Sequence, residues 1–128
     1  MAEAIAEMNR HYVADVAAML PGDRVLVDVA GRTVGVFRLE EHYVAYENMC
    51  PHMGGPVCEG RVMPRVDAIV DDAGRLVAER SNDDKPNLVC PWHGWEFDIR
   101  TGQGTGDRTR SLRAYLVEVE EDRVYVVA

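Results

Sequence analysis

Two short segments of the sequence carry the residue types that bind metals. The first places His52 two residues after Cys50, and the second places His93 three residues after Cys90. A thiolate and an imidazole this close in sequence can reach one site from a single turn, and the proline and glycine residues around them restrict the backbone of each turn. The four side chains therefore predict a metal site with two sulfur and two nitrogen ligands.

The two segments resemble those of the Rieske family, whose [2Fe-2S] cluster is held by two cysteines on one iron and two histidines on the other. The resemblance extends over the strand and turn at 95–102 and the closing strand at 111–115. Upstream of the loops it covers the segment at 16–22 and the strands that follow it as far as residue 46. It implies one Rieske-type [2Fe-2S] cluster, with Cys50 and Cys90 as ligands of one iron and His52 and His93 as ligands of the other.

A structural zinc site is the alternative, because two thiolates and two imidazoles also suit a tetrahedral Zn²⁺ ion. The second Cys–His pair lacks the histidine spacing of a helical zinc finger. Both loops are rich in glycine and apolar residues, which a cluster needs for backbone N–H donors and for shielding. These features favour the cluster, although ligand identity by itself leaves both possibilities open.

Residues beside the ligands bear on the reduction potential. High-potential members of the family carry an additional cysteine in each loop, joined as a disulfide, and a Ser and a Tyr that donate to sulfur. Here Gly55 and Trp92 stand at the two cysteine positions, and Trp95 and Phe97 at the Ser and Tyr positions. The resemblance thus implies a potential at the low end of the range of about −150 to +300 mV. Trp92 could either cover the core or lie exposed at the tip.

Other residues of metal-binding type have simpler interpretations. Cys58 has no candidate partner, and we expect a small buried hydrophobic residue rather than a reactive thiol. Met49 and Met53 are expected to shield the site rather than to bind metal. His11 and His42 lie outside both loops and are expected to be surface or strand residues.

The elements that must position the two loops have the chemistry of β-strands. β-branched and aromatic residues occur in short runs between turn signals, which predicts an all-β fold of antiparallel sheets with a small cluster-binding subdomain formed by the two loops. A short helix could begin within 2–8, and a Gly31-Arg32 turn is expected to close the first hairpin. Strands are expected over 24–30, 33–39, 43–46, 115–120 and 124–127.

The segment between the two loops is longer than in most short ferredoxins of the family. Runs at 66–70 and 75–78 flank a glycine-containing loop and predict a hairpin, which we place as an insertion over about 62–86. Residues 80–86 are polar and are expected to form an exposed loop. We predict a single domain over 1–128, with its cluster-binding part over about 48–98. The hairpin is either a tolerated insertion or an arm for a partner.

Composition excludes several classes of function. The 128 residues suit one compact domain, and their formal charge of −8 repels nucleic-acid phosphates and anionic lipids. The acidic N-terminal residues have no features of a secretory signal, and no stretch reaches membrane-span length. Three cysteines cannot form a fully paired disulfide set. We expect a cytoplasmic protein that binds neither nucleic acid nor membrane. Because both loops lack charged residues, we also expect an apolar tip on an acidic body.

A Rieske centre moves one electron, whereas oxygen activation in the ring-hydroxylating relatives needs a separate iron held by two histidines and a carboxylate. Beyond His52 and His93, the two remaining histidines form no such motif with an acid. The resemblance implies a ferredoxin rather than an enzyme. It would carry electrons from a flavin-containing reductase to a terminal ring-hydroxylating oxygenase through transient contacts, with no small-molecule substrate. The alternatives are the small Rieske subunit of an assimilatory nitrite reductase and a non-catalytic redox-sensing or interaction module.

Overall fold

The computed structural model describes residues 9–128, and within that range it describes the backbone alone at 65–68 and 81–85. The helix predicted within 2–8 lies outside the described residues. Over the described part, the regular structure is antiparallel β-sheet with two short 3₁₀ turns. None of the helical turns in this part of the chain is long and apolar enough to cross a membrane. The all-β prediction is confirmed.

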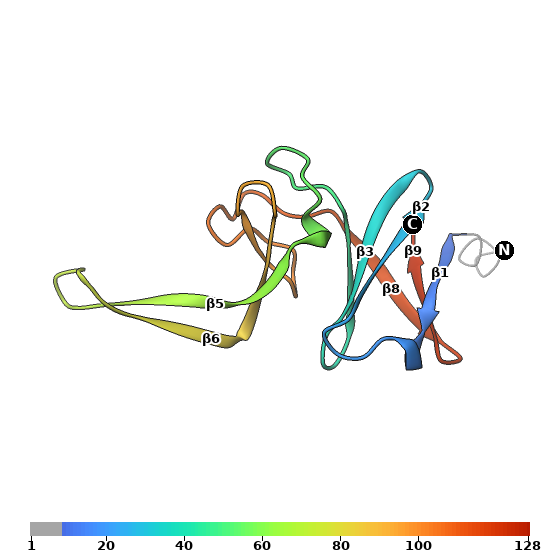
Figure 1. Ribbon diagram of the computed structural model, residues 1–128, viewed down its shortest axis with the longest axis horizontal. Coiled ribbons are helices and arrows are strands. Elements are labelled where there is room, and N and C mark those ends of the chain that lie inside the picture. Colours follow the sequence, from blue (N-terminus) through green and yellow to red (C-terminus); the bar gives the residue numbers. More distant parts are fainter. Residues whose placement is uncertain (1–8) are drawn as a thin grey trace.

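A six-stranded antiparallel sheet forms the base of the molecule, with the strand order β1-β9-β8-β4-β3-β2 (Figure 1). The 3₁₀ turn η1 (Val16–Ala18) follows the first strand. The strands of this sheet coincide with the predicted runs and add one at the N-terminal side: β1 (Arg10–Asp15), β2 (Arg24–Val29), β3 (Arg32–Arg38), β4 (Tyr43–Glu47), β8 (Ala114–Glu120) and β9 (Arg123–Val127).

The turn between β2 and β3 lies one residue earlier than predicted. Val29 pairs with Arg32, so the two connecting residues are Ala30 and Gly31. Their φ angles are 51° and 81°, and two consecutive positive φ angles are the geometry of a type I′ turn, whose twist matches that of the strands. The predicted Gly31-Arg32 turn is wrong because the glycine occupies the second position of the turn, not the first.

A smaller sheet carries the segment between the two predicted loops. It consists of β5 (Arg61–Val70), β6 (Leu76–Val89) and β7 (Glu96–Asp98), in that order, and the 3₁₀ turn η2 (Val57–Glu59) precedes it. β5 and β6 form the predicted hairpin, which projects away from the rest of the chain (Figure 1). The loop expected over 80–86 is wrong. This polar segment belongs to β6, because 64–67 of β5 supplies the antiparallel partner that short-range patterns do not reveal.

Strands β3 and β4 separate two hydrophobic cores, because successive side chains of a strand point to opposite faces. Val36 and Ala45 belong to the core of the base sheet, whereas their neighbours Phe37 and Tyr46 belong to a second core beneath the predicted loops. The second core also contains Cys50, Val57, Cys58, Leu88, Cys90, Phe97, Ile99 and Leu112. The cysteines of both loops are therefore part of a packed core that rests on the base sheet.

Two long-range contacts fix this second core to the base. The Tyr46 hydroxyl donates to the carbonyl oxygen of Ile99 at 2.7 Å. The Arg24 guanidinium on β2 donates to the carbonyl oxygens of Cys58, at 2.8 Å, and Gly60. Both contacts hold the backbone close to the loops, so the loop positions depend on the base sheet.

Candidate metal centre

The two predicted loops have the same backbone frame. In each loop the cysteine N–H donates to a carbonyl oxygen five residues later, and the cysteine carbonyl accepts from the glycine N–H four residues later, at 2.7–3.0 Å. These glycines, Gly54 and Gly94, have φ angles of 78° and 71°, in a region that residues with a side chain rarely adopt. The shared Cys-Pro-x-x-Gly pattern therefore has a structural cause in both loops.

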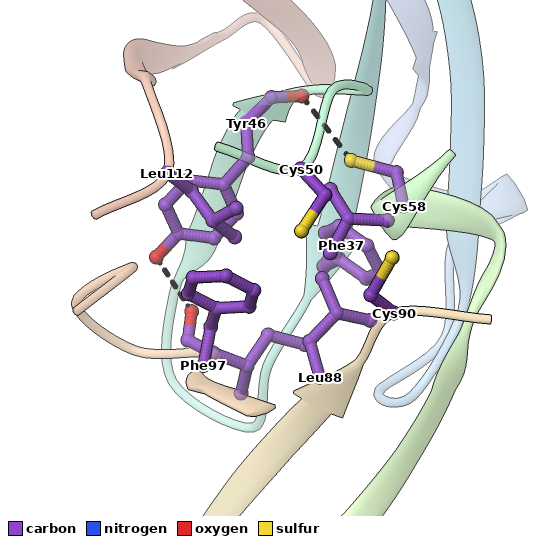
Figure 2. Close-up of a cluster of buried hydrophobic side chains, with 10 residues drawn as sticks. Phe37, Tyr46, Cys50, Cys58, Leu88, Cys90, Phe97 and Leu112 are labelled. Carbon is purple, nitrogen blue, oxygen red and sulfur yellow. Dashed lines mark hydrogen bonds between the residues drawn. The ribbon is translucent and has the colours of Figure 1, made fainter. Parts of the chain in front are cut away.

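The frame places the two loop cysteines together. Cys50 and Cys90 are buried, at 3% and 2% exposure, and Figure 2 shows their sulfur atoms at the same end of the second core. Burial raises the pKa of the Cys50 thiol, and the adjacent Cys90 sulfur contributes to the same effect. Both are free thiols. Two neighbouring sulfur atoms held on rigid turns form one half of the predicted donor set.

The two loop histidines form the other half. The ring centroids of His52 and His93 lie 5.0 Å apart, with an angle of 89° between the ring planes. His93 is exposed, and His52 is half-buried. Among the described residues, the buried Nδ1 of His52 has no hydrogen-bond partner. Leaving a buried nitrogen without a partner costs free energy, so this atom fits a position where a metal ion would complete it.

The arrangement bears on the choice between a cluster and a single zinc ion. The structure brings all four predicted side chains to one end of the molecule, as a sulfur pair and an imidazole pair. Among the side chains that the structure describes, no three His, Cys, Asp or Glu residues come close enough together to bind one ion. A tetrahedral zinc site needs four donors around one point, whereas a [2Fe-2S] cluster spreads its ligands over two metal atoms. The donor set fits the cluster.

Trp92 was considered either as a cover of the core or as an exposed residue of the tip, and its side chain has features of both. Its side chain is 58% exposed, which places it at the surface of the tip. Its inner side lies against Gly55, where an added Cβ would be 2.9 Å from Trp92 Cγ and 3.0 Å from Cys90 Sγ. The close approach of the two loops therefore requires the absence of a side chain at Gly55, because both the indole and the Cys90 sulfur lie against this position.

An aromatic ring that the loop sequence alone could not place lies against the proposed ligands. Trp95 stacks on His52, with ring centroids 4.4 Å apart and planes 15° apart. Arg110 lies on the same ring, its guanidinium carbon 5.2 Å from the Trp95 centroid. It also donates to the Pro51 carbonyl oxygen at 3.1 Å. Sequence analysis missed Arg110 because nothing in the local pattern marks a residue 59 positions from Pro51 as its neighbour.

Of the other loop residues with simpler interpretations, the structure supports the one given to Cys58. Cys58 is fully buried, its thiol donates to the Tyr46 carbonyl oxygen at 3.3 Å, and burial raises its pKa to about 12, so it is a core residue rather than a reactive thiol. The shielding role expected of Met49 and Met53 stays a prediction, and the two side chains are 54% and 63% exposed.

The two histidines outside the loops take no part in this site. His11 belongs to β1 at the far edge of the base sheet, where it pairs with β9. His42 is exposed in the connection between β3 and β4. The prediction that they are surface or strand residues is confirmed.

Comparison with known proteins gives a consistent result. The family model of the Rieske [2Fe-2S] domain matches residues 9–116. The ferredoxin component of an alkene monooxygenase system from Xanthobacter autotrophicus is 25% identical over 124 residues, which is 94% of this chain and 85% of that protein.

Solved structures show the same likeness. A complex of reduced oxygenase and oxidized ferredoxin in carbazole 1,9a-dioxygenase contains a chain with 26% identity and a TM-score of 0.67, and the match covers 93% of both chains. The NAD(P)H nitrite reductase small subunit from Erwinia carotovora has 21% identity and a TM-score of 0.59, over 94% of this chain and 82% of that one. The second likeness concerns the fold alone.

Proposed function

Because the chain belongs to the Rieske [2Fe-2S] domain family, we propose that it is a low-potential Rieske-type ferredoxin that carries single electrons to a terminal ring-hydroxylating oxygenase. The observation that carries this proposal is the pair of matched loops, which place two thiols and two imidazoles at one end of the molecule. A flavin-containing reductase is the proposed electron donor. The relatives of this chain that are ferredoxin components of oxygenase systems support the electron-carrier role.

The proposed cluster ligands are Cys50 and Cys90 on one iron and His52 and His93 on the other. When bound, a [2Fe-2S] cluster supplies a site that accepts and releases one electron. The chain holds that site on two rigid turns, buries the two sulfur ligands in the second core and leaves the His93 ring exposed. Such burial on one side and exposure on the other suits electron exchange through the histidine edge.

We propose that the chain has no catalytic centre of its own. Oxygen activation would need a second iron held by two histidines and a carboxylate, and His11 and His42 lie on separate elements away from the loops. The partner oxygenase would supply that iron. None of the three cysteines forms a disulfide in the described part of the chain, which supports the proposed cytoplasmic location.

The tip around the proposed cluster is the proposed docking surface for both partners. Met49, Met53 and Trp92 are each more than half exposed there. The body of the chain is acidic, with a formal charge of −8. An apolar tip on an acidic body suits a small, fast-dissociating interface steered by charge toward a basic rim on the partner. Raised ionic strength is then expected to slow reduction by the reductase.

The small subunit of an assimilatory nitrite reductase is the second candidate, since the fold is shared. Some members of that group lack cluster ligands, whereas all four proposed ligands are present here. To separate the two functions, the reduced protein is mixed in a stopped-flow instrument with a ring-hydroxylating oxygenase and, separately, with the large subunit of a nitrite reductase. Rapid oxidation by the oxygenase alone supports the ferredoxin. Oxidation by the nitrite reductase alone contradicts it, and oxidation by neither favours a redox-sensing module.

A further inference from the structure

One cationic side chain reaches the proposed cluster ligands from a distant part of the chain. Arg110 lies just before the segment that leads into β8, yet its Nη1 donates to the Pro51 carbonyl oxygen at 3.1 Å. Its Nε lies 3.6 Å from Oδ2 of Asp107. Hydrogen bonds from Thr109 hold the pKa of Asp107 below its usual value, so this carboxylate stays ionised at neutral pH and fixes the other side of the guanidinium.

Arg110 also forms one end of a continuous series of stacked groups. Its guanidinium lies over the Trp95 ring, Trp95 lies flat on His52, and His52 meets the edge of His93. A planar guanidinium can stack on an aromatic ring and donate to a carbonyl at the same time, which a lysine ammonium cannot do. Arg110 therefore contacts the loop of His52 directly, at Pro51. It reaches the His52 ring indirectly, because Trp95 lies between them.

The orientation of His52 needs a support of this kind. Histidines that bind metals usually have their rings fixed by a hydrogen bond from the second nitrogen. Nδ1 of His52 is the nitrogen that would face the metal, and the ring contacts that the structure shows are Trp95 stacked on its face and His93 in a T-shaped contact. If Trp95 moves, the support on one face of the imidazole is lost.

We propose that Arg110 is a positioning residue for the metal centre: it clamps the first loop and the Trp95–His52 stack, and thereby sets the reduction potential. This inference rests on the proposed function, because it takes His52 as a cluster ligand. A fixed cation near the site favours the state with the additional electron and so raises the potential. A fixed imidazole keeps the ligand geometry uniform, which the g-values of the reduced protein report. Losing Arg110 is expected to lower the potential.

The test uses the holoprotein with Arg110→Gln, Arg110→Lys and Arg108→Gln. Arg108 is exposed in the same loop, so its replacement removes the same charge without touching the stack. The readouts are the midpoint potential and the g-values of the reduced protein by EPR, with circular dichroism as the check on folding. At the wild-type midpoint, we expect Arg110→Gln to lower the ratio of reduced to oxidised protein by up to about tenfold, equivalent to about 59 mV for one electron, and to change the g-values.

Arg110→Lys keeps the charge and is expected to restore part of the potential but not the wild-type g-values, while Arg108→Gln leaves both unchanged. The inference is overturned if Arg110→Gln has wild-type values, if Arg108→Gln causes the same shift, or if Arg110→Lys restores both readouts fully. A wild-type protein without a Rieske signal would instead refute the proposed function. If Arg110→Gln fails to fold, Arg110→Lys still decides through its g-values.

Discussion

Replacing Gly55 with alanine is expected to strain the contact between the two loops. An added Cβ would lie 2.9 Å from Trp92 Cγ and 3.0 Å from both Trp92 Cδ2 and Cys90 Sγ. Carbon atoms in favourable contact lie about 3.5–4.0 Å apart, so the new methyl group would be too close by about 0.5–1 Å. Overpacking of this kind costs about 1–3 kcal/mol, and we expect the free energy of unfolding to fall by that amount.

The assay is urea-induced unfolding of the holoprotein by circular dichroism, with iron and sulfide content measured in parallel. Gly106→Ala is the matched control, because Gly106 is exposed and a Cβ there meets nothing within 4 Å. In a Trp92→Ala background the indole contacts disappear, so Gly55→Ala is expected to cost less there than in the wild type. The reasoning is refuted if Gly55→Ala is as stable as Gly106→Ala, or if its cost does not depend on Trp92.

The remaining predictions concern the second core, the potential and the hairpin. Burial raises the pKa of Cys58 from 9.0 to about 12, so above pH 9 the unfolded chain releases a proton that the folded chain keeps, and stability falls. The free energy of unfolding of Cys58→Ala, measured by urea titration between about pH 8 and 10, is expected to fall less steeply with pH than that of the wild type. Equal slopes for the two proteins would contradict this. Tyr46→Phe removes the donor to the Ile99 carbonyl and is expected to cost about 1–3 kcal/mol of unfolding free energy; a loss within error of zero argues against that bond. Phe97→Tyr adds one hydroxyl donor and leaves the Trp95–His52 stack in place, so it is expected to raise the midpoint potential, and an unchanged or lower value by voltammetry counts against a role for sulfur hydrogen bonds. Replacing 66–81 by a two-residue Asn-Gly turn is expected to leave the EPR signal unchanged because the hairpin projects away from the loops, whereas loss of the cluster would show that the hairpin supports them.

Local patterns in the sequence predict the strands, because the alternation of side chains along a strand is visible in a short run of residues. Alternation around Val36 and Phe37 predicts a strand, and the structure shows why both faces are apolar: each face meets a different core. The burial of Cys58 likewise follows from its lack of a partner in sequence. The four proposed ligands remain a prediction, since neither the fold nor the family match tests them individually.

Features that depend on distant segments could not be read in this way. The polar segment 80–86 looks like a loop until its partner in β5, 64–67, is known. Arg110 looks like an exposed charge until the fold brings it to Pro51 and Trp95. Its position also changes the expected picture of an entirely apolar tip, because a cation from outside the loops lies at the edge of that surface. Pairing and stacking across such distances follow from the whole topology, which no short pattern contains.

The most direct test of the central claim is a spectroscopic one. The protein is purified anaerobically, and its absorption and low-temperature EPR spectra are recorded before and after reduction with dithionite. A [2Fe-2S] cluster held by Cys50, His52, Cys90 and His93 predicts a reddish-brown protein whose reduced form has an average g-value below that of all-cysteine clusters. A colourless protein that contains one zinc ion per chain would contradict the proposed cluster and the electron-carrier function.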